Sequence, residues 1–276
     1  MLDAHVHVWD PRMLRYPWLD GAPHLNRPHL PDDIDDGGGR VDEWVFVEAD
    51  PQGRLAQTEA EWVDALDWPG LVGIVAHLDL TRRDVARQLD DLSRIPRLRG
   101  VRFVLEGDTH VTDEGGLSGA FAILEQRSLT FDACVHWTQL SALARALDGL
   151  PAVNVILDHA GKPPVDDGLA SGSGRAWFAA LAELAAIPTV AVKLSGMPAE
   201  GSSTESVSRH APDFLRASLD LFGAERSMFG SDWPVSARGP GGSSTSRWAD
   251  TVASAAEAHD ARWIFGATAE KIYALR

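Results

Sequence analysis

A distorted (β/α)8 barrel is the fold class that this 276-residue sequence predicts, and three observations predict it. Short apolar runs rich in β-branched residues recur eight times, as is typical of parallel strands buried on both faces. Amphipathic segments of helical period lie between them. Long segments rich in glycine and proline begin where several of the runs end. A doubly wound α/β sheet is the alternative, but no glycine-rich phosphate-binding fingerprint follows an early run.

Eight runs are the predicted strands, each mostly apolar and with polar residues at or near its end. The first is Met1–Trp9, in which Val6 and Val8 supply β-branched bulk. The other seven are Trp44–Asp50, Gly73–Leu80, Gly100–Leu105, Thr130–His136, Val153–His159, Val190–Ser195 and Arg226–Asp232. In a parallel barrel the carboxyl ends of all strands meet at one mouth, so the polar residues that end these runs are expected to converge there.

The predicted helices fall between these strands. Thr81-Arg-Arg-Asp84 resembles a capping box, after which Val85, Leu89 and Leu92 lie on one helical face. The other helical segments, several of them rich in alanine, are Leu55–Leu66, Leu140–Leu147, Ala176–Ala186, Ala211–Phe222, Trp248–Ala258 and a short closing helix at Thr268–Leu275.

Four predicted loops are too long to be simple connections. They are Asp10–Asp42, Glu106–Gly116, Lys162–Gly174 and Pro234–Ser246. Each follows a predicted strand, so all four are expected at the C-terminal mouth, where long loops usually act as active-site lids. The sequence shows no internal repeat and no domain boundary, which predicts one domain over residues 1–276.

Composition excludes several classes of partner. A formal net charge of −15 argues against binding to nucleic acid or to an anionic membrane, and no apolar stretch is long enough to span a bilayer. No basic and apolar leader precedes the first strand, and the single cysteine, Cys134, cannot form an internal disulfide. We therefore expect a cytoplasmic protein in which Cys134 is a small buried hydrophobe, with the oligomeric state, a homo-oligomer included, left open.

Two histidines in the first strand are the strongest functional signal. His5 and His7 project to the same side because side chains alternate along a strand. Imidazoles placed in this way can share a metal ion or polarise one substrate oxygen. Asp232, near the other end of the sequence, follows Gly230 and precedes Pro234 at the end of the last predicted strand. A carboxylate opposite two imidazoles can bind a metal or deprotonate water.

Other polar residues near strand ends are expected at the same mouth. His159 is placed for proton transfer at the end of an apolar strand. Lys193 and Arg102 are flanked by apolar residues and are costly to bury without an anion, which favours substrate binding by both. Glu48, His136, and His77 or Asp79 complete the set.

The chain resembles the amidohydrolase superfamily in six stretches that span most of its length in order. More narrowly, it is similar to the lactonase-type branch of TIM-barrel hydrolases that includes L-fuconolactonase and 2-pyrone-4,6-dicarboxylate lactonase. The stretches are Asp3–Asp10 with Tyr16–Leu19, Gly100–Arg102, Leu157–Pro163, Lys193–Gly196, Met228–Val235 and Ile264–Ala269.

The resemblance implies a barrel that hydrolyses a cyclic ester, with Asp232 as the base that activates water. It also implies that His5, His7 and His159 surround the reacting carbonyl and that Arg102 grips the substrate. Arg102 lies where binuclear relatives carry a carboxylated lysine or a glutamate, which argues against a bridged two-metal site. One zinc ion, held by His5, His7, Asp232 and either His136 or His159, and hydrolysis without a metal both stay open.

The favoured hypothesis is therefore hydrolysis of a small-molecule substrate, a sugar-derived or related hydroxy-acid lactone. Arg102, Glu48, Lys193 and His136 are expected to bind its polar groups, and Trp9, with Trp18 and Trp137, to offer flat apolar surface to its ring. Two alternatives remain: a zinc-dependent decarboxylase of an aromatic or dienoic acid on the same scaffold, and a barrel that binds a metabolite without catalysis. The sequence does not identify the lactone.

Overall fold

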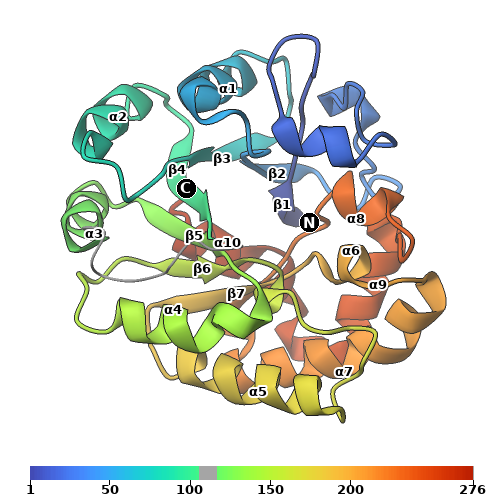
Figure 1. Cartoon of the computed structure of the whole chain (residues 1–276). Helices are drawn as coiled ribbons and strands as arrows, with labels where there is room; N and C mark the ends of the chain where they lie inside the picture. The colour runs from blue at the N-terminus through green and yellow to red at the C-terminus, as the bar shows by residue number, and fades with distance from the viewer. Residues whose placement is uncertain (106–116, 276) are drawn as a thin grey trace.

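The computed structural model describes residues 1–105 and 117–275 and confirms the predicted barrel. Eight parallel strands form one sheet in chain order, and a parallel bridge between Val6 and Trp233 joins its two edges. Figure 1 shows the helices as a ring around these strands. The predicted loop Glu106–Gly116 lies outside the described residues. In the described part of the chain, no helix is both long enough and apolar enough to cross a membrane.

All eight predicted strands are present. They are β1 (Leu2–Val6), β2 (Glu43–Val47), β3 (Leu71–His77), β4 (Leu98–Val104), β5 (Thr130–Cys134), β6 (Val155–Leu157), β7 (Val190–Leu194) and β8 (Ser227–Phe229). Every strand ends earlier than predicted, and as a result His7, His159 and Asp232 lie just beyond β1, β6 and β8. The backbone at His159 and Asp232 is left-handed, with φ of 55° at both, which is incompatible with a strand.

The helices that follow the strands are mostly those predicted. They are α1 (Ala56–Asp64), α2 (Val85–Leu92), α3 (Leu117–Gln126), α4 (Leu140–Leu147), α5 (Gly172–Ala185), α6 (Met197–Glu200), α7 (Thr204–Phe222), α8 (Val235–Arg238), α9 (Thr245–Ala255) and α10 (Thr268–Ile272). The sequence analysis missed α3, α6 and α8. It also placed the start of α7 at Ala211, whereas Ser203 caps this helix by accepting a hydrogen bond from the backbone N–H of Ser206.

The predicted capping box at Thr81 is wrong. Helix α2 begins at Val85 and its N-cap residue is Asp84, whose side chain makes no capping hydrogen bond. Thr81 instead donates its backbone N–H and its hydroxyl to Asp79 Oδ1, at 2.9 and 2.6 Å. Asp79 therefore stabilises the turn after β3, because its carboxylate satisfies donors that the end of the strand leaves unpaired.

The inside of the barrel is closed at one end by α10. A buried cluster joins inward-facing residues of the strands, such as Val45, Val75 and Ile156, to Tyr273 just after α10. In Figure 1, α10 lies behind the strands, near the middle of the ring of helices. A larger apolar cluster fills the layer between the sheet and the outer helices. This two-layer core fixes the strand ends from which the site is built.

The long segment Asp10–Asp42 is folded against the mouth of the barrel. It contains two short 3₁₀ helices, η1 (Pro17–Gly21) and η2 (Pro31–Asp33). Its side chains form a buried cluster with strand-end residues: Trp9, Leu14, Tyr16, Leu19, Leu25 and Ala49. Paired backbone hydrogen bonds join Trp9 and His29, and the Trp18 indole donates to the carbonyl oxygen of Ala49 at 2.7 Å. We refer to this segment as the N-terminal lid.

His29 gives the N-terminal lid a pH-dependent stability. Its ring is buried edge-on between Trp9 and Trp233, and burial, assisted by Arg27 and Arg238, lowers its pKa to about 4. As pH falls below about 6.5, the unfolded chain takes up a proton that folded His29 does not, so the folded state loses stability.

We expect the variant His29→Phe to resist acid better than the wild type. Between about pH 7 and about pH 5, the wild type should lose about 2 kcal/mol of unfolding free energy relative to the variant. Urea unfolding at both pH values measures this difference. Parallel loss in the two proteins would show that His29 is not a source of acid sensitivity.

Candidate active site

His5 and His7 project to one point, as predicted. Their Nε2 atoms are 3.1 Å apart, and both rings are buried. His7 Nδ1 lies 2.8 Å from the carbonyl oxygen of Val47. Because a carbonyl only accepts, Nδ1 carries the proton and Nε2 of a neutral His7 presents a lone pair to the site.

Asp232 is brought to these imidazoles by the closure of the barrel. Its backbone N–H donates to the carbonyl oxygen of His5 at 2.8 Å, and the N–H of His7 donates to that of Trp233 at 2.9 Å. The carboxylate has two different environments. Oδ2 accepts a hydrogen bond from the Ser236 hydroxyl at 2.7 Å, while Oδ1 faces Nε2 of His7 at 3.3 Å and of His5 at 3.7 Å.

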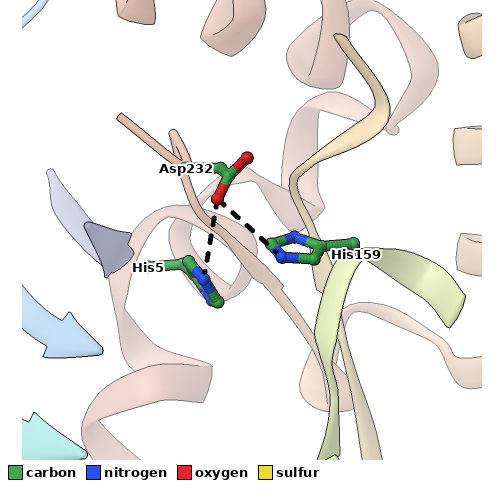
Figure 2. Close-up of side chains that lie close together, drawn as sticks. All are labelled: His5, His159 and Asp232. Atoms are coloured by element: carbon green, nitrogen blue, oxygen red, sulfur yellow. Dashed lines mark ion pairs between the residues drawn. The ribbon is translucent and has the colours of Figure 1, made fainter. Parts of the chain in front are cut away.

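His159 completes the cluster from the other side, as Figure 2 shows with His5 and Asp232. Its Nε2 lies 3.8 Å from Asp232 Oδ1, and its Nδ1 is 2.9 Å from the Ser195 hydroxyl. Residues 159–162 all have positive φ and form a left-handed turn after β6 that aims the ring at the mouth. Gly196, after β7, leaves room for that ring, since a Cβ there would come within 2.3 Å of it.

Burial and mutual contact set the charges of this cluster. Burial raises the pKa of Asp232, but His159, His7 and His5 outweigh it and hold the pKa well below its ordinary value. Burial lowers the pKa of His159 to about 4 and also that of His5, which Lys193 lowers further. At neutral pH the site therefore holds a carboxylate facing neutral His5 and His159.

These four side chains fit a single divalent cation. His5, His159 and Asp232 offer ligand atoms within 4.8 Å of one another, and His7 Nε2 lies 3.1 Å from His5 Nε2 and 3.3 Å from Asp232 Oδ1. Four donors around a tetrahedral zinc ion lie about 3.3 Å apart, since Zn–N bonds are about 2.0–2.1 Å long. The contacts of 3.1–3.8 Å lie close to that spacing. His136, the alternative ligand, instead forms a hydrogen bond between its Nδ1 and the Thr138 hydroxyl, at 3.0 Å.

A pocket of about 260 Å³ opens above the cluster. Of the residues predicted at the site, His7, Trp9, Trp18, Arg102, His159 and Asp232 line it. Sequence analysis missed much of the remaining wall, which is formed by Ala49, Asp50, Val104, Cys134, Lys162, Gly196, Ala199, Glu200 and Val235. The wall thus combines two indole rings with several charged groups.

Arg102 reaches the pocket but is held from behind by the protein. Its Nε donates to Glu48 Oε1 at 2.6 Å, Nη2 donates to the Glu48 carbonyl oxygen at 2.5 Å, and Nη1 lies 3.5 Å from Asp158 Oδ2. Burial raises the pKa of Glu48, but Arg102 and His77 overcome this and hold it at about 2. Glu48 does not line the pocket. Its charge orients Arg102 rather than meeting a substrate directly.

Lys193 is fully buried beneath the pocket. Its Nζ lies 2.5 Å from Asp132 Oδ2, 3.0 Å from Asp158 Oδ1 and 3.0 Å from His5 Nδ1. Two carboxylates of the protein, those of Asp132 and Asp158, therefore pair with the buried ammonium group. Neither Lys193 nor His136 lines the pocket, and Trp137 packs against the outer core, so these three predicted contacts do not reach the space where a substrate would bind.

Two serines that orient site residues were missed by sequence analysis. Ser195 follows Lys193 at strand spacing, and Ser236 follows Asp232 at the i+4 spacing of a helical turn. Both spacings are visible in the sequence. What the sequence lacks is any sign that the backbone turns left-handed at Asp232, which places its carboxylate beside Ser236.

Comparison with known proteins gives consistent matches along the whole chain. The family model described as "Amidohydrolase" matches residues 2–275. The L-fucono-1,5-lactonase of Burkholderia multivorans is 33% identical over 99% of this chain and 96% of its own length. That of Burkholderia ambifaria is 33% identical over 85% of this chain and 80% of its own length.

Solved structures also match this chain along its whole length. The crystal structure of an amidohydrolase from Burkholderia multivorans with bound zinc has a TM-score of 0.87 and 32% identity, covering 100% of this chain and 99% of that one. A putative 2-pyrone-4,6-dicarboxylic acid hydrolase from Pseudomonas putida has a TM-score of 0.75 and 21% identity, covering 100% and 97%. The second likeness shows a common fold.

Replacing Gly196 by alanine should disrupt the site. The new methyl group would collide with His159 and displace its ring, and a displacement of about 1 Å at a catalytic group can cost on the order of a hundredfold in rate. The variant Gly38→Ala is the matched control, because Gly38 has a similar φ of +74° and nothing within 4 Å of its Cβ position. Thermal unfolding should show a comparable backbone penalty of about 1–2 kcal/mol in both variants, with activity lost only in Gly196→Ala.

Proposed function

Because the chain belongs to the amidohydrolase family, we propose that it is a lactonase, a hydrolase that opens a sugar-derived or related hydroxy-acid lactone by attack of water on the ring carbonyl. The observation that carries this proposal is the convergence of Asp232 with His5, His7 and His159, of which Asp232, His7 and His159 line one pocket. The relatives named as L-fucono-1,5-lactonases, at 33% identity, support the same reaction class.

Asp232 is the proposed base. Its depressed pKa keeps it ionised, and the Ser236 hydroxyl holds Oδ2 so that Oδ1 is directed at the imidazoles. A water molecule beside Oδ1 would lose its proton to this oxygen as it attacks the carbonyl carbon. General-base assistance of this kind contributes about 10²–10⁴-fold to a rate.

The charge that develops on the carbonyl oxygen requires a stabilising cation, because Nε2 of a neutral His7 presents a lone pair to the site and not a proton. His5, His7, His159 and Asp232 are the residues that would hold a zinc ion, which supplies Lewis-acid stabilisation of the oxyanion when bound. In the metal-free alternative, His159 Nε2 is not a ligand, and from the pocket wall, 3.8 Å from Asp232 Oδ1, it can pass the proton that Asp232 took from water to the alkoxide released from the ring. Ser195 fixes the orientation of that ring through Nδ1.

The pocket wall positions the lactone. Trp9 and Trp18 offer flat apolar surface to the ring carbons, as sugar-binding sites commonly do. Arg102, with its guanidinium oriented by Glu48, donates hydrogen bonds to the substrate's oxygens. We propose that this small-molecule reaction takes place in the cytoplasm, where a single buried cysteine stays reduced.

The two alternative functions, zinc-dependent decarboxylation and metabolite binding without catalysis, have less support. A 5-carboxyvanillate decarboxylase from Sphingomonas paucimobilis shares the fold at 12% identity, which carries no argument about chemistry. A binding protein without catalysis does not need a carboxylate with a depressed pKa at the centre of an imidazole cluster. A lactone screen that includes aromatic acids as decarboxylation substrates separates all three.

The variant Asp232→Asn tests the base. We expect kcat/KM for aldono-1,5-lactones to fall at least about a hundredfold, because an amide cannot accept the proton. A pH-indicator assay, corrected for spontaneous hydrolysis, measures the rate. The variant Asp166→Asn removes a carboxylate that caps surface residues Ser202 and Ser206 and should keep wild-type activity. Undiminished turnover by Asp232→Asn would remove the proposed base.

Metal removal tests the cation. We expect the protein as purified to contain close to one zinc ion per chain, and dialysis against a chelator to abolish both the zinc and the lactonase activity. Zinc added back should restore both in parallel, since three of the four side chains that would bind the ion also line the pocket. Full activity in metal-depleted protein, with metal content measured by mass spectrometry, would show that the side chains act without a metal.

A further inference from the structure

His5 Nδ1 faces two buried groups that make opposite demands. The Lys193 ammonium, 3.0 Å away, can only donate a hydrogen bond. The Asp158 carboxylate, whose Oδ1 is 3.2 Å away, can only accept one. All three side chains are fully buried, so water cannot serve either group instead. A neutral imidazole can satisfy only one of the two neighbours at a time.

The contact of His5 Nε2 determines whether Lys193 or Asp158 is satisfied in this structure. His5 Nε2 is 3.1 Å from His7 Nε2, and the Val47 carbonyl keeps the proton of His7 on Nδ1. The proton between the two Nε2 atoms therefore belongs to His5. Its Nδ1 is then an acceptor and takes the hydrogen bond from Lys193. Within the described residues, Asp158 Oδ1 accepts no hydrogen bond in this arrangement, although it keeps its ion-pair contact with Lys193.

A metal ion reverses this requirement, because a ligating nitrogen must present a lone pair. We propose that His5 changes tautomer when the site takes up zinc, moving its single proton from Nε2 to Nδ1, where Asp158 Oδ1 accepts it. Lys193 and Asp158 are the positioning residues that stabilise the two tautomers. The proposal rests on the metal site of the proposed function and deepens it. No net proton is gained or lost by His5, and Asp158 gains the hydrogen bond that it lacks.

Lys193 keeps its ion pairs when His5 changes tautomer. Its Nζ retains Asp132 and Asp158 when His5 stops accepting, so its charge stays paired. Asp132 is in turn fixed by the Tyr273 hydroxyl, which donates to Oδ2 at 2.6 Å. The other two histidines are not placed between opposed partners. His7 is locked by a backbone carbonyl, and His159 meets a serine hydroxyl, which can donate or accept.

Histidine ring ¹⁵N spectra of the full-length protein test the proposal directly. In metal-free protein, His5 should carry its proton on Nε2. After saturation with zinc, it should carry the proton on Nδ1. His7 is the internal control and should keep its proton on Nδ1 in both states. A His5→Gln variant assigns the resonance. A His5 ring already protonated on Nδ1 without zinc, or one unchanged by zinc, would overturn the proposal.

Two matched variants separate this role from loss of a buried charge. The variants Asp158→Asn and Asp132→Asn each remove one carboxylate beside Lys193, but only Asp158 contacts His5. We expect the zinc dissociation constant to rise about 10–100-fold in Asp158→Asn and by less than about threefold in Asp132→Asn. Equal losses in both variants would mean that only the pairing of Lys193 matters and would refute a specific role for Asp158.

The measurements do not depend on the lactone. Zinc affinity by competition with a chromophoric chelator, and ring protonation by NMR, are read without substrate. If the tautomer changes but no lactone is hydrolysed, the proposed function fails and the inference stands. If lactones are hydrolysed but His5 keeps one tautomer, the inference fails and the proposed function stands.

Discussion

The backbone join between the end of β1 and the segment after β8 is the constraint on which the site depends. His5 and Asp232 are far apart in the sequence, and the hydrogen bond from the Asp232 N–H to the His5 carbonyl forms only when the barrel closes. The Asp3 carboxylate reinforces this join, because its Oδ1 accepts from the N–H groups of Ser231 and His5. Closure of the barrel therefore also brings Asp232 to the histidines.

Directly beneath the pocket, one layer of the barrel interior is polar, and its charged groups contact one another. Two cations, Arg102 and Lys193, face three carboxylates, those of Glu48, Asp132 and Asp158. Burial of charges is costly unless each one is paired, so this layer is weak evidence for stability by itself. Its value is positional: Glu48 and Asp158 contact Arg102, which lines the pocket, and Lys193 contacts His5 of the histidine cluster, as supporting residues do in preorganised sites.

The sequence was sufficient to predict the barrel and the residues that meet at its mouth. Eight apolar runs and polar strand ends carry that information, because parallel strands are buried on both faces and all point one way. Depth was not predictable: Glu48, Lys193 and Arg102 look alike as polar residues near strand ends, yet only Arg102 reaches the pocket. The left-handed backbone at His159 and Asp232 was also invisible, since neither residue type requires it.

The strand ends and the N-terminal lid supply different parts of the site. The histidines and the aspartate proposed for the reaction come from β1 and from the residues just after β1, β6 and β8, which the closed sheet holds in place. Trp18 comes from the lid, where it packs in one buried cluster with Trp9 and Tyr16. A substitution deep in that cluster therefore moves the aromatic wall without touching the histidines. The packing of this segment therefore sets the shape of the aromatic wall, and the shape of a pocket wall is what a neutral ring contacts.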